Sequence, residues 1–140
     1  MRKAITIGLI VFGVTGVLWA ATGWTLRRGD EKVAKFNVEA ENLIGGIQQY
    51  KEFVGTYPAG SNIGIAKALL GQTDKRVLIL AVRKTDLNDK GEILDPWGTP
   101  LQFYFSHNEV MIRSAGPNKV WQDSAVASAD DLYRCAAVTR

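Results

Sequence analysis

The only histidine, His107, is the first side chain to test for chemistry, because a serine or cysteine nucleophile needs a base that a third group orients. Ser106 and Asn108 are its neighbours only along the chain, inside the polar stretch 106–109 that we predict to be a hairpin turn. Cys135 is the only cysteine, so no intramolecular disulfide can form, and we expect it to be a small apolar residue in a C-terminal strand. These residues predict no nucleophile–base pair.

Other signatures of catalysis are also missing from the sequence. No zinc-ligand spacing, phosphate-cradling glycine loop or nucleotide motif occurs. Glu39 and Glu41 stand two positions apart on an expected helix, so they do not face each other, and a solvated helix surface explains them. We therefore predict that the protein is not an enzyme and has no catalytic residue, no cofactor-binding motif and no small-molecule substrate.

Positive charge is concentrated around one apolar segment. The sequence has a net charge of +3 and a pI of about 9.1. Four of its 17 Lys and Arg residues flank that segment, which leaves 13 basic against 14 acidic residues from Asp30 onward; the four are Arg2, Lys3, Arg27 and Arg28. No basic stripe with interleaved aromatic residues follows, so we expect no nucleic-acid binding.

The apolar segment Ala4–Leu26 contains 23 consecutive residues without a charge. At ~1.5 Å per residue, a helix of this length crosses a bilayer core of ~30 Å. A cleaved secretory signal is the competing interpretation, with Ala21-Thr22-Gly23 as its cleavage site. Because the run is long for a signal core, we favour a basic leader and retained transmembrane helix over residues 1–29, followed by a soluble domain over 30–140. Basic residues on both flanks leave the orientation open.

Apolar residues between Glu31 and Val54 recur mostly at steps of three and four, which predicts an amphipathic helix over 31–54 with one buried face. The apolar positions are Val33, Phe36, Ala40, Leu43, Ile44, Ile47, Tyr50 and Val54. Gly45-Gly46 weakens this helix by about 1 kcal/mol per glycine relative to alanine. We expect either close packing of the helix backbone on a sheet at this point or a bend.

The segment after this helix is predicted to contain one more short helix. Gly55 and Pro58 end the first helix, and 63–70 has the pattern of the second. The apolar patch Val77–Val82, inside the polar stretch 72–93, fits either a helix or a strand, so its structure stays open.

The stretch Asp95-Pro96-Trp97-Gly98-Thr99-Pro100 is predicted to be a structural corner. The proline disfavours helix at Asp95, and Gly98 takes a positive φ without a side-chain clash. Trp97 is then an apolar anchor held on a tight turn, facing a small core. Pro100 suits the first residue of a strand.

Alternating residues after the corner predict an antiparallel sheet. Leu101–Phe105 should pair with Val110–Ser114 as a β-hairpin, and Leu132–Val138 is a candidate third strand. The Gly-, Pro-, Ser- and Ala-rich stretch 114–131, which we name the late loop, connects them.

Several motifs occur in a fixed order over about Val33 to Leu132. The apolar helix continues into the amphipathic one, and the motifs that follow are Gly55-Thr56-Tyr57-Pro58, the corner, Ser114-Ala115-Gly116-Pro117-Asn118 and Asp130-Asp131-Leu132. Together they resemble the major pseudopilins of type II secretion systems, the G-type proteins of the pilin superfamily. The resemblance implies an α+β, pilin-like fold, in which a long N-terminal helix, first membrane-spanning and then amphipathic, packs on a small antiparallel β-sheet.

The same resemblance implies a function. The protein would be a non-catalytic, membrane-anchored structural subunit of a type II secretion or pilus-like assembly, serving protein transport. Its partners would be other pseudopilin or secretion-system subunits, bound through the N-terminal helix. It would be a single-pass protein of the inner (cytoplasmic) membrane with a periplasmic or extracytoplasmic C-terminal domain.

Calcium is the cofactor that the resemblance implies, held in the late loop. Asp130 and Asp131 match the paired carboxylates of the family, with Ser114 and Asn118 as helpers, and Asp123 is a further acid in this loop. A hard cation of this kind takes carboxylate, hydroxyl and carbonyl oxygens. The alternative is that two solvated aspartates cap a helix or strand.

The N-terminus departs from the family pattern. Pilin precursors carry a glycine cleavage site followed by Phe-Thr-Leu-Ile-Glu, whereas no acidic residue occurs between Met1 and Leu26. This departure motivates a second hypothesis, a monotopic pilin-fold binding or adaptor module that does not polymerise. A secreted domain with a cleaved signal is the third.

Overall fold

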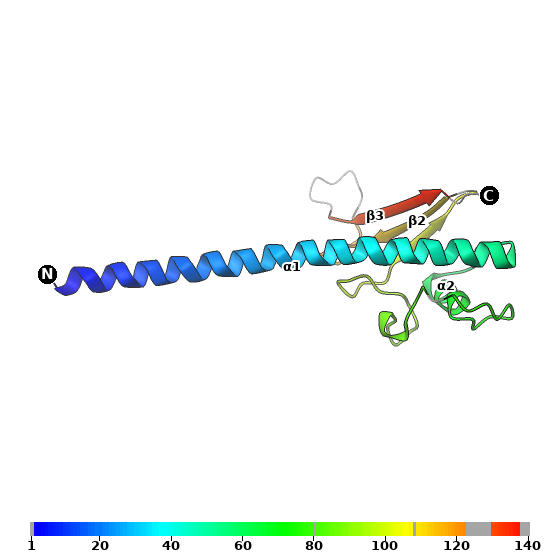
Figure 1. Ribbon diagram of the computed structural model, residues 1–140, viewed down its shortest axis with the longest axis horizontal. Coiled ribbons are helices and arrows are strands. Elements are labelled where there is room, and N and C mark those ends of the chain that lie inside the picture. Colours follow the sequence, from blue (N-terminus) through cyan, green and yellow to red (C-terminus); the bar gives the residue numbers. More distant parts are fainter. Residues whose placement is uncertain (1, 80, 108, 123–129, 138–140) are drawn as a thin grey trace. The chain divides into compact units, whose positions relative to one another are not determined.

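The computed structural model of the chain describes residues 2–79, 81–107, 109–122 and 130–137, with side chains described from Arg28 onward. The elements along the chain are α1 (Arg2–Val54), α2 (Asn62–Leu69), the short 3-10 helix η1 (Lys84–Asp86), β1 (Gln102–Phe105), β2 (Glu109–Ser114) and β3 (Leu132–Ala137) (Figure 1). The chain divides into two compact units, Met1–Ala34 and Lys35–Arg140. The first unit is the beginning of α1, and the second holds the core.

The predicted membrane segment Ala4–Leu26 lies outside the residues whose side chains are described. Within the part of the chain that is described, no helix is both long enough and apolar enough to cross a membrane.

Helix α1 buries the face that its periodicity predicts. Six of the expected apolar side chains are at most 5% exposed: Phe36, Ala40, Leu43, Ile44, Ile47 and Tyr50. Val33 and Val54, at the two ends of the pattern, are half-buried. A helix that buries one stripe and solvates the other is stabilised mainly by that packing. The amphipathic helix expected over 31–54 is therefore confirmed.

The two adjacent glycines of α1 have different surroundings. A Cβ atom at Gly46 would collide with the Ala81 side chain and lie 3.1 Å from Ile79 Cγ2, whereas a Cβ atom at Gly45 would meet nothing within 4 Å. The helix continues through both residues. Close packing at the glycine pair is thus present, but its partner is the segment around Ile79 and Ala81 and not the sheet.

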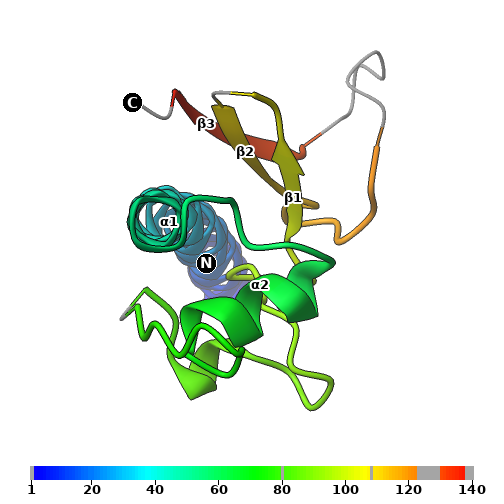
Figure 2. The same cartoon turned by 90° about the vertical axis from the view of Figure 1, so that its right-hand side faces the viewer.

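Strands β1, β2 and β3 form one antiparallel sheet in the order β1-β2-β3. Phe105 pairs with Val110 across the hairpin turn, and Ser114 pairs with Leu132. Figure 2 shows α1 end-on against one face of this sheet. On β2, Val110, Ile112 and Ser114 are fully buried and alternate with less buried residues, as a strand with one covered face requires. The predicted hairpin, the third strand and the α+β class are confirmed.

The stretch of chain that connects α1 to β1 contains α2, the short helix η1 and irregular segments. In the described part of the patch Val77–Val82 there is neither helix nor strand, only a bridge between Leu70 and Leu78 and a hydrogen bond from Ile79 N–H to the Leu69 carbonyl at 2.8 Å. An apolar run this short has no periodicity that distinguishes helix from strand. Its described residues Leu78 and Ile79 pair with the chain at the end of α2.

One side chain joins α2 to the segments on either side of the corner. Asn62 Nδ2 donates to the Ile93 carbonyl at 2.9 Å and to the Leu101 carbonyl at 2.7 Å. Its Oδ1 accepts from the Ile93 N–H at 2.5 Å. Leu101 N–H also donates to the Ile93 carbonyl at 2.9 Å, so the two segments pair with each other as well.

The corner itself is built around a buried carboxylate. Asp95 is 5% exposed, and its Oδ1 accepts from the N–H groups of Trp97 at 2.9 Å and Thr99 at 2.8 Å. Gly98 has φ +87°, the conformation expected at this turn. Trp97 is buried, as expected for an anchor facing the core. Pro58, which follows the end of α1, is buried as well.

Candidate functional site

The late loop brings its two ends together over Gly116. This residue has φ +68°, and a Cβ atom there would collide with the Asp130 carbonyl oxygen, so only glycine fits. The Lys119 N–H donates to the Gly116 carbonyl at 3.2 Å and closes a turn. The beginning of the loop is thereby placed directly beside the paired aspartates at its end.

Asp131 has a buried side chain, 1% exposed. Its Oδ2 accepts from Arg113 Nε at 2.7 Å and Nη2 at 2.5 Å. Its Oδ1 is buried and has no hydrogen-bond partner among the residues that the structure describes.

Asp130 has the same asymmetry between its two oxygens. Oδ2 accepts from the Asn118 N–H at 3.2 Å, while Oδ1 is buried with no partner in the described part of the chain. A buried carboxylate oxygen without a partner is costly, and such groups commonly mark the place of an ion or an ordered water. Each of the paired aspartates therefore has one oxygen that an ion or an ordered water would satisfy.

The two predicted helper residues lie at different places. Asn118 is beside Asp130, and its own side chain braces the loop, because Oδ1 accepts from the Val120 N–H at 2.7 Å and Nδ2 donates to Gln122 Oε1 at 2.9 Å. Ser114 instead donates to Asp95 Oδ2 at 2.6 Å and accepts from the Gly116 N–H at 3.1 Å. Its hydroxyl therefore belongs to the corner. Asp123 lies outside the described residues.

The donor set at the loop fits calcium in chemical type. Calcium takes six to eight oxygen ligands, including carboxylates, carbonyls and water, whereas zinc favours nitrogen and sulfur. Asp130 and Asp131 each offer one free oxygen. Within the described residues no group of three or more acidic, histidine or cysteine side chains gathers, so the remaining ligands would be carbonyl oxygens and water.

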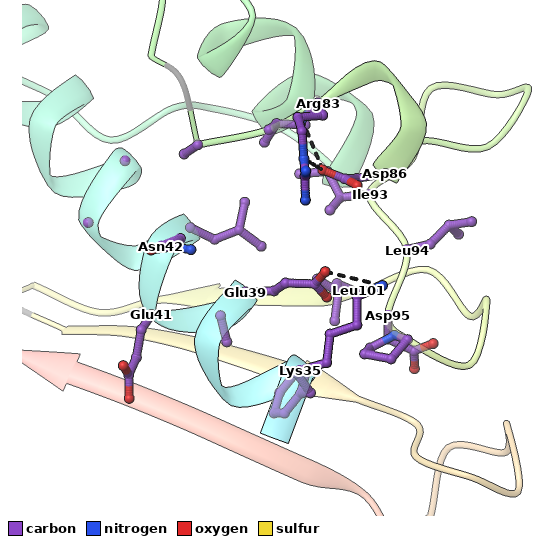
Figure 3. Close-up of a pocket in the computed structure, with 18 of the residues that line it drawn as sticks. Lys35, Glu39, Glu41, Asn42, Arg83, Asp86, Ile93, Leu94, Asp95 and Leu101 are labelled. Atoms are coloured by element: carbon purple, nitrogen blue, oxygen red, sulfur yellow. Dashed lines mark hydrogen bonds and ion pairs between the residues drawn. The ribbon is translucent and has the colours of Figure 1, made fainter. Parts of the chain in front are cut away.

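A groove of about 790 Å³ lies within the second unit, between α1 and the segments around Ile79 and Ile93. Figure 3 shows Arg83 and Asp86 at one side of it, and Lys35 and Glu39, from α1, at the other. Each pair is joined by an ion pair of 3.4 Å. The apolar lining includes Phe36, Ala40, Leu43, Ile79, Val82, Ile93 and Leu101.

The groove has the size of a small-ligand or peptide site, but both of its lining cations, Lys35 and Arg83, are already paired with lining carboxylates. Sequence reasoning missed it. The available signal was the combination of Gly45-Gly46 on a helix with the unassigned apolar patch Val77–Val82, because small residues permit a second segment to approach a helix closely.

The two side chains first tested for chemistry are at the surface. His107 is exposed in the turn between β1 and β2, and Cys135 is exposed on β3 with its thiol free. On β3 the cysteine pairs in register with Met111, which has no acid–base function. Within the described residues this geometry supplies no oriented nucleophile.

No protein-family profile, no curated protein and no solved structure matches this chain.

Proposed function

We propose that this protein is a non-catalytic, membrane-anchored, pseudopilin-like structural subunit of a type II secretion or pilus-like assembly. The observation that carries the proposal is α1 itself, which buries one stripe of side chains under a small antiparallel sheet and exposes the opposite stripe. Residues 4–26 of the same helix have the uncharged composition of an anchor.

The exposed stripe of α1 supports a role in lateral packing. Two large apolar side chains on it are solvent-exposed, Val38 at 59% and Phe53 at 73%. They lie among exposed residues that are mostly polar or charged: Lys35, Glu41, Asn42, Gln49 and Glu52. Phe53 is of the aromatic type that is enriched at protein–protein interfaces, and Val38 adds a second exposed apolar contact on the same stripe.

Calcium in the late loop completes the proposal as a structural cofactor. Asp130 and Asp131 would hold the ion through their unpartnered Oδ1 atoms, and Asn118 would keep Asp130 in place through its N–H. The ion supplies positive charge that compensates buried carboxylates and ties the end of the loop to its beginning.

A photo-crosslinking amino acid at position 38 tests the packing role directly. In membranes of the native host, the substituted full-length protein should give a ladder of crosslinked copies or secretion-system subunits after irradiation. His107 is a matched exposed position at the hairpin turn and should give far less product. Monomer alone at position 38, with the other subunits present, would refute the assembly role.

The second candidate is a pilin-fold binding or adaptor module that does not polymerise, and the 790 Å³ groove favours it. Gly45 lines this groove and has open space around its Cβ position, so Gly45→Leu fills the groove without a backbone clash. The adaptor hypothesis expects loss of function from this variant and none from Gly29→Leu, which is also on α1 in open space but does not line the groove. Gly45 is spaced three and four positions from Asn42 and Gln49 of the exposed stripe, so the assembly hypothesis also expects Gly45→Leu to disturb lateral packing. Crosslinking from position 38 in the otherwise unchanged protein separates the two hypotheses, because the adaptor hypothesis expects monomer alone there.

The mature N-terminus separates both hypotheses from the third. The intact mass of the protein purified from its native membrane should equal that of a chain beginning at Met1 if the anchor is retained. A chain beginning near Trp24 would identify a secreted domain and would remove the membrane argument.

A further inference from the structure

Arg113 of β2 connects the sheet to two described residues of the late loop, Gln122 and Asp131. Its guanidinium donates to Asp131, immediately before β3, and its Nη2 also donates to the Gln122 carbonyl oxygen. The side chain is 18% exposed. One cation therefore joins β2 to two points of the late loop, nine and eighteen positions further along the chain.

Aromatic rings hold the guanidinium in this position. Its Cζ lies 5.2 Å from the ring centroid of Trp121 and 5.4 Å from that of Tyr133, both within the range of a cation–π interaction. Burial lowers the pKa of Arg113, but the hydrogen bond to Asp131 raises it, and the balance lies above the ordinary value. Arg113 is thus charged at every physiological pH.

Arg113 neutralises only one of the two paired aspartates. The guanidinium lies against one carboxylate, Asp131, while Asp130 has an N–H donor but no cation among the described contacts. The half-buried Asp130 carboxylate therefore remains without a cation among the described contacts, and two carboxylate oxygens remain unpartnered. A site built for calcium alone would not need a permanent cation on one of its carboxylates.

We infer that Arg113 is a built-in cation of the late loop: it holds residues 122 and 131 on the sheet without metal, and calcium completes a loop that is already closed. This inference rests on the calcium site proposed above. It makes Arg113 a positioning residue, because it fixes Asp131 by taking Oδ2 and leaving Oδ1 free.

Cleavage by endoproteinase Lys-C after Lys119 measures closure of the loop locally. Lys119 is exposed in the turn that begins at Gly116, and this protease does not cut at arginine, so changing Arg113 removes no cleavage site. The full-length protein is purified in detergent micelles and digested in EGTA or in excess calcium. The fragment that begins at Val120 is quantified by mass spectrometry.

In EGTA, Arg113→Gln should be cut about tenfold faster than the wild type or more, because two charge-assisted hydrogen bonds to Asp131 are lost. Arg113→Lys keeps the charge without the planar fork and should be intermediate. The matched control is Arg134→Gln on β3, whose ion pair with Glu41 of α1, at 3.2 Å, does not involve the loop. Its cleavage rate should equal that of the wild type.

The outcomes separate this inference from the calcium proposal. Slower cleavage of the wild type in calcium than in EGTA supports the metal site, and wild-type cleavage that is the same in both overturns it while leaving the role of Arg113 intact. An Arg113→Gln loop that stays open in calcium is expected, because that variant no longer fixes Asp131. If EGTA alone opens the wild-type loop as far as Arg113→Gln does, calcium is the closing element and the inference is wrong. Equal protection of wild type and Arg113→Gln in EGTA also overturns it. If Arg113→Gln fails to fold, Arg113→Lys decides by the same comparison.

Discussion

Replacing Asp95 by alanine removes the centre of the corner and should destabilise the second unit strongly. Three hydrogen bonds disappear, from the N–H groups of Trp97 and Thr99 to Oδ1 and from the Ser114 hydroxyl to Oδ2. Ser114 is fully buried and Trp97 is 8% exposed, so water does not readily replace the lost acceptor. The donors would remain buried and unsatisfied.

The magnitude follows from these contacts. A hydrogen bond to a charged group contributes about 1.5–3 kcal/mol, and a buried donor left without an acceptor costs about 1–3 kcal/mol. The values do not add, because removal of the carboxylate also ends the cost of burying it. We expect Asp95→Ala to lower the free energy of unfolding by about 3–5 kcal/mol, a large part of the ~5–15 kcal/mol typical of a domain.

Urea unfolding of the full-length protein, followed by tryptophan fluorescence, measures this loss. Ser114→Ala alone should cost about 1–3 kcal/mol, because it leaves Asp95 Oδ2 without its donor. The double variant should cost less than the sum of the two single variants by about 1 kcal/mol or more, since the two groups share one bond. Asp89→Ala is the matched control at an exposed aspartate and should change stability by less than about 0.5 kcal/mol.

A stability of Asp95→Ala within about 1 kcal/mol of the wild type would contradict the role of the carboxylate, because its three hydrogen bonds, two buried and one partly buried, cannot be that weak. Strict additivity of Asp95→Ala and Ser114→Ala would contradict the direct bond between them. Either result would mean that the corner is held by the packing of Trp97 and not by the carboxylate.

Three further predictions concern other parts of the second unit. Gly45→Ala should raise the free energy of unfolding by about 0.5–1 kcal/mol, whereas Gly46→Ala should lower it by about 1–3 kcal/mol because its Cβ collides with Ala81. The same urea titration measures both variants, and equal effects would contradict the close approach of Ala81 to Gly46. Removal of calcium with EGTA should lower the melting temperature of a calcium-loaded preparation, and Asp130→Ala combined with Asp131→Ala should abolish that difference; a wild-type melt indifferent to EGTA, in protein shown to contain metal beforehand, would refute the site. Asn62→Ala should cost about 2–4 kcal/mol through three lost hydrogen bonds, and a loss under about 1 kcal/mol would show that they are replaceable.

Regular patterns of side chains made the framework predictable. The three- and four-residue steps from Val33 to Val54 located the buried face of α1, and alternation after the corner located the hairpin. Both signals are local, because helix and strand periods are imposed by the backbone itself. Trp97 and Gly98 were likewise assigned to a turn from neighbouring residues alone.

The contacts that define the candidate sites were not predictable in the same way. Arg113 alternates with buried residues on β2 and so has the pattern of a solvent-facing strand residue, yet its partner is Asp131, eighteen positions later. Asp95 was expected only to start a turn, because its bond to Ser114 depends on where β2 ends in space. The groove depends on the approach of Ala81 to Gly46, between segments that share no sequence period.

The amide of Asn62 has a mechanical consequence for the non-sheet half of the second unit. By donating to two carbonyls and accepting from one N–H, it behaves toward residues 93 and 101 as a peptide group of a neighbouring strand would. A single side chain thus makes the hydrogen bonds of a strand and attaches α2 to residues 93 and 101, on either side of the corner. The connection between α2 and residue 93 carries none of these three bonds, so the attachment of α2 to the corner does not depend on the length of that connection. Insertions are therefore best tolerated in its exposed polar parts, away from Ile79 and Ala81, which pack near Gly46 of α1.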